Sequence, residues 1–401
     1  MTVEEPPSYN DMGGMEMLTS LTIAGFRSIR EQTVDLAPLT VLYGPTASGK
    51  SSLLYAPLVL RNLVSNPNEP VDSFFALGFV NLGGFEECVF NHQKDAEIRI
   101  SYSTADGEYG VVLRRTSGEL QLKTGDGVDV SMEVAFPYAV NQEVSQMLNL
   151  VQIRWNGITC DVYVDSAQLQ QQAKDLAVRA NGVVNYARKL DIVPHRRGFF
   201  KPYYSPVPVT PFPTSEDELA TLVINNPYLA PKVSVDLEEI VGRDFRLYAP
   251  PGSGFTYLQT TDKQARVPTN LANDGFGVNQ LVYMLAKIHG SDTGTVLMEE
   301  PEVHLHPSVM RRFARRLCRI VSEEGKQVLL TTHSEVFVGA VLAAVARREI
   351  PADSVRFYLV EKEGKKTVFR HQAVTEEGQI EGGMKTFIEG ELEDIRALLG
   401  M

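Results

Sequence analysis

Cysteine is scarce in this sequence, and its three cysteines form no recognisable pattern. Cys88, Cys160 and Cys318 lie far apart, and no two of them have a CxxC or zinc-ligand spacing. Separate cysteines in odd number are typical of reduced, buried thiols. The sequence therefore predicts neither a disulfide framework nor a zinc site built from these residues.

Long hydrophobic runs are also missing. The longest uncharged apolar stretch is Val336 to Ala346, whereas a helix needs about 20 apolar residues to cross a bilayer. Residues 1–17 hold four acids and no apolar run, which argues against a secretory signal and predicts a disordered leader. We therefore expect a cytoplasmic protein without membrane contact.

Positive charge is in deficit, with 38 basic residues against 50 acidic ones and a net charge of −12. Much of the excess lies at the two ends, in the leader and in residues 376–394. A strongly acidic chain argues against a general nucleic-acid binder. Because the rest of the chain is close to neutral, basic patches on it remain compatible with the composition.

The order of the patterns predicts an α/β fold in several parts. Strand-like text from residue 18 leads into a helical run, which Pro57 is expected to kink or end. Three alternating segments within residues 96–125 predict an antiparallel meander, and alternating strands and helices return near residue 270. The predicted parts are a leader (1–17), an N-terminal half (18–134), an insertion with a helical lobe and a Pro/aromatic loop (135–269) and a C-terminal half (270–401).

A phosphate-binding loop is the most specific motif. Residues 44–51 read GPTASGKS and match GxxxxGK[ST], with an apolar strand before them and a helix start after them. Glycines let backbone N–H groups surround phosphates, while Lys50 would reach the β- and γ-phosphates and Ser51 would bind Mg²⁺. The predicted ATP-binding residues of this loop are Gly44, Pro45, Thr46, Ala47, Ser48, Gly49, Lys50, Ser51 and Ser52.

Two carboxylates follow a second apolar strand, Thr295 to Met298. At the carboxyl end of a strand beside a phosphate loop, one carboxylate can hold magnesium and the next can polarise the attacking water. We assign Glu299 to the metal and Glu300 to the general base. His333 follows the next strand, where it can hydrogen-bond the γ-phosphate. The predicted catalytic residues are therefore Glu300, His333 and Lys50.

These segments together resemble the ABC ATPases of the SMC/RecF/OLD group, and among them the short prokaryotic AAA-type ATP-binding proteins without long coiled coils. The resemblance covers residues 18–65 and 270–395 and is carried by LTIAGFRSIRE, LTVLYGPTASGKSSLL, NDGFGVNQL, VLMEEPEVHLHP and VLLTTHS. It implies a P-loop NTPase fold of ABC type. Such a fold has a mostly parallel core sheet, an antiparallel β lobe and, here, a large insertion between the Walker A and Walker B motifs.

The resemblance also implies how the site is completed. Residues 273–277, with Asn273, Asp274 and Gly275 as the nucleotide-binding positions, would form the signature segment, which caps the ATP of a partner subunit from a helix N-terminus. ATP would therefore drive the formation of a homodimer. Arg27 and Ser28 match positions that approach the nucleotide in related ATPases.

Three positions depart from the family pattern. Asn273 stands where serine is usual, Glu299 where the Walker B aspartate is usual, and Thr46 where asparagine is common. These changes bear on the turnover rate more than on ATP binding. The glutamine that usually links the two lobes has two candidates, Gln93 and Gln142.

Two basic segments are candidate surfaces for nucleic acid. One is a helical stripe of arginines, which is equally typical of a solvated face neutralised by nearby acids. The other is a loop that mixes bases with aromatics, as single-strand binders do, and that could equally be structural. The candidates are Arg311, Arg315 and Arg319 in the helix and Arg196, Arg197 and Lys201 in the loop.

Two functional hypotheses remain. One is an ATP-hydrolysing switch in DNA repair or antiphage defence, and the other is a nucleotide-gated scaffold that controls an effector protein. A transporter subunit is disfavoured because the LSGGQ text is absent. The segment after His333 has no DxD carboxylate pair, so we expect no Toprim-type nuclease module. His304 and His306 are either a metal-binding pair or part of the HLHP text of the family.

Overall fold

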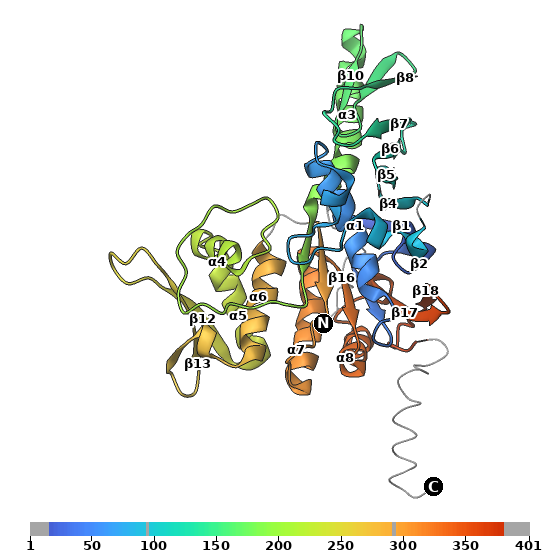
Figure 1. Ribbon diagram of the computed structural model, residues 1–401. Helices are drawn as coiled ribbons and strands as arrows, with labels where there is room; N and C mark the ends of the chain where they lie inside the picture. The colour runs from blue at the N-terminus through green and yellow to red at the C-terminus, as the bar shows by residue number, and fades with distance from the viewer. Residues whose placement is uncertain (1–15, 94–95, 291–293, 381–401) are drawn as a thin grey trace, which may run out of the picture.

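The computed structural model describes residues 16–93, 96–290 and 294–380. Its centre is a six-stranded sheet in the order β11-β15-β16-β3-β17-β18, parallel throughout except for the final hairpin (Figure 1). The mostly parallel core sheet predicted from the sequence is thus confirmed. The strands are β3 (Leu39–Tyr43), β11 (Leu190–Val193), β15 (Thr295–Glu299), β16 (Gln327–Thr332), β17 (Val355–Glu363) and β18 (Lys366–Gln372).

The central strands of this sheet are buried on both faces, which explains their continuous apolar text. Leu297 and Leu329 pack into a core shared with α1 (Lys50–Ser65) and the antiparallel lobe. Their neighbours Val296 and Val328 pack into a second core on the opposite face. The alternation of side chains along a strand therefore divides the interior into two cores.

The antiparallel lobe is a second six-stranded sheet in the order β2-β1-β4-β5-β6-β7. Its last four strands form the meander that the alternating segments predict, although the analysis of the sequence did not identify the final strand. A smaller sheet and a helix extend the lobe away from the core (Figure 1). The elements are β1 (Leu18–Phe26), β2 (Ile29–Asp35), β4 (Ile98–Thr104), β5 (Gly107–Leu113), β6 (Ser117–Thr124), β7 (Asp129–Ala135), β8 (Val144–Leu148), β9 (Val151–Trp155), β10 (Cys160–Tyr163) and α3 (Gln170–Asn185).

Helix α1 lies between the two large sheets and contacts strands of both. Pro57 neither ends nor sharply divides it, because the helix is assigned without interruption to Ser65. Most side chains of α1 are buried, including both neighbours of Pro57. Packing on two sides stabilises the helix enough to tolerate the loss of the backbone hydrogen bond that proline cannot make.

A helical lobe covers the other face of the core sheet and projects to one side (Figure 1). It includes a three-stranded antiparallel sheet, β12-β13-β14. Strand β11 belongs to the core sheet although its residues lie within the predicted insertion, so that segment contributes to both parts. The elements are α4 (Glu216–Asn225), α5 (Leu229–Val241), β12 (Arg243–Tyr248), β13 (Tyr257–Asp262), β14 (Pro268–Asn270), α6 (Phe276–Gly290), α7 (Pro307–Glu324) and α8 (Glu335–Ala346).

Short helical turns complete the description. They are α2 (Phe85–Cys88), η2 (Val71–Phe75), η3 (Phe90–His92), η4 (Ala167–Leu169), η5 (Tyr186–Lys189), η6 (Leu271–Asn273) and η7 (Ala352–Ser354). The three cysteines are buried and unpaired, as predicted. Within the described ranges, no helix is long and apolar enough to cross a membrane. Most of the predicted leader (residues 1–15) and most of the acidic C-terminal segment (381–401) lie outside the described residues.

Candidate nucleotide site

The loop between β3 and α1 has the backbone that a phosphate cradle needs. Gly44, Ala47 and Gly49 have positive φ angles of 146°, 61° and 100°. A Cβ atom on Gly44 would lie 2.3 Å from the carbonyl oxygen of Val360, so only glycine fits there. Because α1 begins at Lys50, the N–H groups of its first turn lie where the loop ends, and that of Ser52 bonds the carbonyl oxygen of Gly49 at 3.1 Å. The loop lines an open pocket of about 720 Å³.

Lys50 is a buried cation held by the loop itself. Its Nζ donates to the carbonyl oxygens of Gly44 (2.9 Å) and Pro45 (2.8 Å) and lies 3.3 Å from Nδ1 of His333. Burial lowers the pKa of Lys50 to about 8, while nearby carboxylates act in the opposite direction. Phosphate oxygens can replace these carbonyl acceptors, so the ammonium group is placed for an anion.

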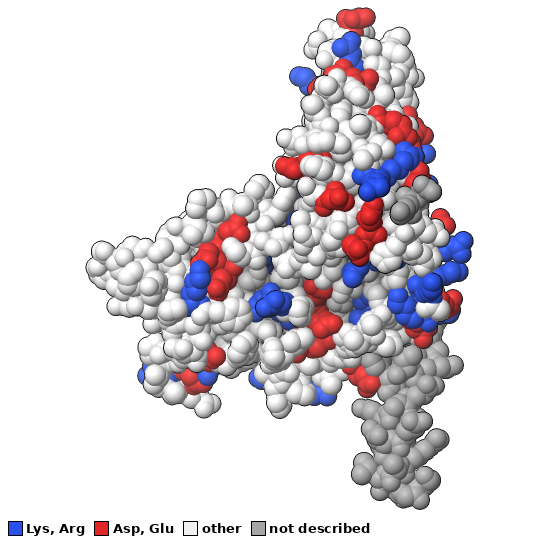
Figure 2. Space-filling model, viewed as in Figure 1, with Lys and Arg blue, Asp and Glu red and all other residues white. Residues whose placement is uncertain are grey.

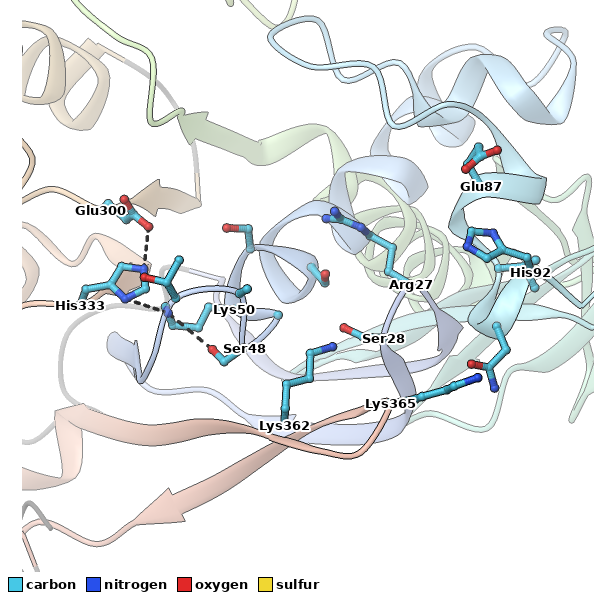
Figure 3. A pocket seen from close by; sticks show the side chains of 17 residues that line it. Arg27, Ser28, Ser48, Lys50, Glu87, His92, Glu300, His333, Lys362 and Lys365 are labelled. Carbon is cyan, nitrogen blue, oxygen red and sulfur yellow. Dashed lines mark hydrogen bonds and ion pairs between the residues drawn. The ribbon is translucent and has the colours of Figure 1, made fainter. Parts of the chain in front are cut away.

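His333 connects Lys50 to Glu300. Its Nε2 lies 2.9 Å from Oε1 of Glu300, while its Nδ1 faces Lys50 (Figure 3). Because an ammonium group can only donate, Nδ1 accepts and Nε2 carries the proton directed at the carboxylate. The three residues predicted to be catalytic thus form one hydrogen-bonded chain at the edge of the pocket.

Glu302 fixes the main chain of His333, a role that the sequence analysis missed. Its Oε1 accepts from the N–H of His333 and the hydroxyl of Thr332, both at 2.7 Å. Burial raises the pKa of Glu302. The carboxyl group anchors the backbone at the end of β16, while the imidazole remains directed at the pocket.

Arg197 fixes the main chain of the two neighbouring carboxylates. Its guanidinium donates to the carbonyl oxygens of Glu299 (2.6 Å), Glu300 (2.7 Å) and Pro194 (3.0 Å). Glu300 has a φ of +40°, a conformation that L-residues rarely adopt, and its N–H donates to Thr331 at 2.9 Å. The prediction that Arg197 belongs to a nucleic-acid surface is wrong, because its side chain is buried and engaged inside the site.

Tyr55 holds the predicted metal-binding carboxylate. Its hydroxyl donates to Oε1 of Glu299 at 2.8 Å, and the backbone N–H of His195 donates to Oε2 at 3.3 Å. Burial, followed by the charge of Glu299, raises the pKa of Tyr55, while the charge of Arg27 lowers it. The hydroxyl of Ser51, the other predicted metal ligand, lines the pocket at the start of α1. A hydroxyl and a carboxylate together suit Mg²⁺, so the donor set fits that ion.

Most of the predicted nucleotide-binding and catalytic residues line the same pocket. They are Arg27, Ser28, Thr46, Ala47, Ser48, Gly49, Lys50, Ser51, Ser52, Glu300 and His333. Gly44 and Pro45 contribute through the carbonyl groups that bind Lys50. Glu299 does not line the pocket and is only 4% exposed.

The pocket also contains residues that the sequence analysis missed. They are Glu87, Val89, Asn91, His92, Lys362 and Lys365. Neither candidate for the linking glutamine is among them: Gln93 lines a different pocket, and the backbone of Gln142 bonds the hydroxyl of Tyr138. Asn91 and His92 directly precede Gln93, and the position of the linking residue stays a prediction.

The predicted signature segment lies at the start of α6 and does not line this pocket. The carboxylate of Asp274 accepts from Arg243 at 3.1 Å and from the hydroxyl of Thr260. Asn273 and Gly275 are exposed, and a Cβ atom on Gly275 would meet nothing within 4 Å. One anchored carboxylate thus holds a turn whose other groups are open to solvent.

The predicted basic stripe of α7 is used largely within the molecule. Arg315 pairs with Glu349, just after the C-terminal end of α8, and Arg319 pairs with Glu239 of α5. Arg311 is exposed and forms no ion pair within the part of the chain that the structure describes. Basic and acidic side chains lie next to each other over much of the face in Figure 2. The solvated, neutralised alternative therefore fits this helix better than a continuous basic surface.

The loop candidates and the HxH pair also have local partners. Lys201 forms an ion pair with Asp217, whereas Arg196 is exposed. His304 lies against the ring of Phe276, and His306 accepts from the N–H of Ser308 at the start of α7. Among the described residues, no group of three or more His, Cys, Asp or Glu side chains could hold a metal ion.

Comparison with known proteins supports the class that this geometry indicates. The family model described as "AAA domain, putative AbiEii toxin, Type IV TA system" matches residues 39–339. An OLD nuclease from Thermus scotoductus is 22% identical over 346 residues, which are 80% of this chain and 60% of that relative. The chain thus spans less than two thirds of the length of this relative.

Solved structures of SMC heads are also similar. An SMC head domain from Thermotoga maritima has 12% identity and a TM-score of 0.43, covering 88% of this chain and 98% of that one. An Smc head with an extended coiled coil from Pyrococcus furiosus, bound to the C-terminal domain of ScpA, has 9% identity and a TM-score of 0.46, covering 95% and 100%.

The protein is an ABC-type ATPase of the SMC/RecF/OLD kind, with the P-loop NTPase fold described above. Within that class, the chain belongs to the family of AAA domains whose model spans residues 39–339.

Proposed function

We propose that this protein binds and hydrolyses ATP with Mg²⁺ and that ATP drives the formation of a homodimer. The observation that carries the proposal is the chain from Lys50 through His333 to Glu300 beside the phosphate loop. Each copy would complete the nucleotide site of the other with its exposed turn at Asn273, Asp274 and Gly275. In the cell, such a switch would serve DNA repair or antiphage defence.

The arrangement supports hydrolysis through positions that the protein already fixes. Lys50 would exchange its carbonyl acceptors for oxygens of the β- and γ-phosphates. The Glu300 carboxylate would accept a proton from water, while His333, through its Nε2, would orient that carboxylate. Ser51, which lines the pocket, and Glu299, at the end of β15, would hold Mg²⁺, which neutralises phosphate charge when bound.

One observation favours a slower alternative, a nucleotide-gated scaffold that controls an effector protein. Both carboxylate oxygens of Glu299 accept hydrogen bonds from the protein, and the side chain is nearly inaccessible. A metal ligand held in this way would have to reorient before it could bind the ion. The longer glutamate at the Walker B position could therefore reduce turnover while ATP binding is kept.

The test is ATP turnover and mass in solution, with and without ATP and Mg²⁺, for the wild type and Glu300→Gln. Hydrolysis predicts steady turnover in the wild type and a loss of about 100-fold or more in the variant, since that is the usual contribution of a general base. The variant should also accumulate as an ATP-bound dimer. Dimerisation of the wild type without turnover would favour the scaffold, and absence of ATP binding would exclude both functions.

A further inference from the structure

Three cations line the nucleotide pocket on the side away from the predicted catalytic chain. Arg27 comes from the turn between β1 and β2, and Lys362 and Lys365 come from the β17–β18 hairpin. Figure 3 shows them across Lys50 from Glu300 and His333. A group of Lys and Arg side chains also gathers over β17 and β18 in Figure 2.

The hairpin is fastened to the phosphate loop by one buried side chain. Thr367 Oγ1 donates to the carbonyl oxygen of Ser48 at 2.8 Å and lies 2.7 Å from Oγ of Ser28. The N–H of Thr367 also donates to the carbonyl oxygen of Ser28 at 2.7 Å. A Cβ atom on Gly49 would lie 2.2 Å from Thr367 Oγ1, so the hairpin, the β1–β2 turn and the loop are in close contact.

Within the described residues, none of the three cations pairs with a carboxylate, although Glu87 also lines the pocket. Within residues 16–93, 96–290 and 294–380, no ion pair involves Arg27, Lys362 or Lys365. Burial, followed by the charge of Arg27, lowers the pKa of Lys362. Like charges that face one pocket repel each other unless an anion lies between them. This side of the pocket is therefore suited to a further anionic group beyond those that Lys50 takes.

We propose that the β17–β18 hairpin is part of the nucleotide site, in which Lys362 and Lys365, with Arg27, bind the α-phosphate end of a nucleotide. The inference rests on the proposed function, which places the γ-phosphate beside Glu300 and His333. A nucleotide lying along the loop then directs its other end at the three cations. Thr367 is a positioning residue that holds the hairpin against the loop.

The test compares the double variant Lys362→Gln, Lys365→Gln with Lys366→Gln, an exposed neighbour on the same hairpin that does not line the pocket. Dissociation constants are measured for ATP and ADP at low and moderate salt. The loss of two charge contacts should weaken the binding of both nucleotides by a similar factor, about tenfold at low salt and less at moderate salt. Lys366→Gln should change either affinity by less than about twofold.

Three outcomes would overturn the inference. They are unchanged affinities in the double variant, an equal loss in Lys366→Gln, and a loss for ATP with ADP unaffected, which would place the cations at the γ-phosphate. Absence of ATP binding by the wild type would instead contradict the proposed function itself. Thr367→Val tests positioning separately: it should weaken nucleotide binding, and Thr367→Ser, which keeps the hydroxyl, should restore it.

Discussion

The nucleotide pocket and the signature turn are built in opposite ways. In the pocket, Lys50, His333 and Glu300 are each held by other groups of the chain, and Arg197 fixes the backbone beneath the carboxylates. In the signature turn, only the Asp274 side chain is anchored, while the residues on either side of it are exposed. The pocket is preorganised within a single copy, whereas the predicted signature turn presents an open helix N-terminus.

The largest effect is expected from a negative charge placed in the exposed signature turn. We expect Gly275→Asp to leave folding intact, because its Cβ has open space and aspartate is a good cap for α6. The carboxylate would face the partner's γ-phosphate at both sites of a symmetric dimer. Because like charges across an interface cost several kcal/mol, ATP-dependent dimerisation should weaken on the order of a thousandfold.

The measurement is sedimentation or light scattering at several protein concentrations, with ATP binding to the monomer recorded in parallel. Gly339→Asp is the matched control, since a Cβ there also meets nothing within 4 Å and the residue lies on a different helix, α8. Normal dimerisation of Gly275→Asp would show that this turn does not complete a second site.

The second effect tests how much the stability of the nucleotide pocket depends on the buried side chain of Arg197. Arg197→Met should lower the free energy of unfolding by about 3 kcal/mol, because three carbonyl oxygens lose a charged donor in a buried position. Arg196→Met, at the exposed neighbour, should change it by less than about 0.5 kcal/mol. Denaturant unfolding of both variants measures these two changes in the free energy of unfolding. Equal changes would contradict the stabilising role of Arg197.

The same contrast explains what the sequence could reveal. The phosphate loop, Glu300 and His333 were predictable because each directly follows an apolar strand, and parallel strands bring their carboxyl ends to one edge. Lys362 and Lys365 were not, since a hairpin far along the chain carries them to the loop. No short-range pattern records that contact.

The Pro/aromatic loop shows a different limit. Its mixture of bases and rings is compatible with a nucleic-acid surface, yet Phe199 is fully buried against Tyr204 and Tyr283. That packing draws Arg197 inward to the carbonyls of the acidic strand end. Strand β11 was missed for a related reason, because four residues are too few to distinguish a core strand from the surrounding insertion.

The third effect is the pH dependence of ATP binding at the nucleotide pocket. The Lys50 ammonium has a pKa of about 8, and phosphate contact favours its charged form. ATP affinity should therefore be constant below pH 8 and fall by up to about tenfold per pH unit above it. Lys50→Arg keeps its charge throughout this range, so its weaker affinity should not change with pH. A wild-type affinity that stays level to pH 9.5 would refute this assignment.

The smallest effect concerns the arginines of α7. Their sequence pattern resembles a surface that binds another molecule, whereas in the structure several of them form ion pairs within the protein. Arg315 is partly exposed and pairs with Glu349, so Arg315→Gln should lower the free energy of unfolding by about 0.5 to 1 kcal/mol. Arg311→Gln removes an exposed arginine without such a partner and should have no measurable effect on stability. The opposite result, unchanged stability together with weaker salt-dependent DNA binding for Arg315→Gln, would show that the stripe is an interface. The ion pair with Glu349 would then be incidental to the fold, and α7 would join the signature turn as a surface that another molecule completes.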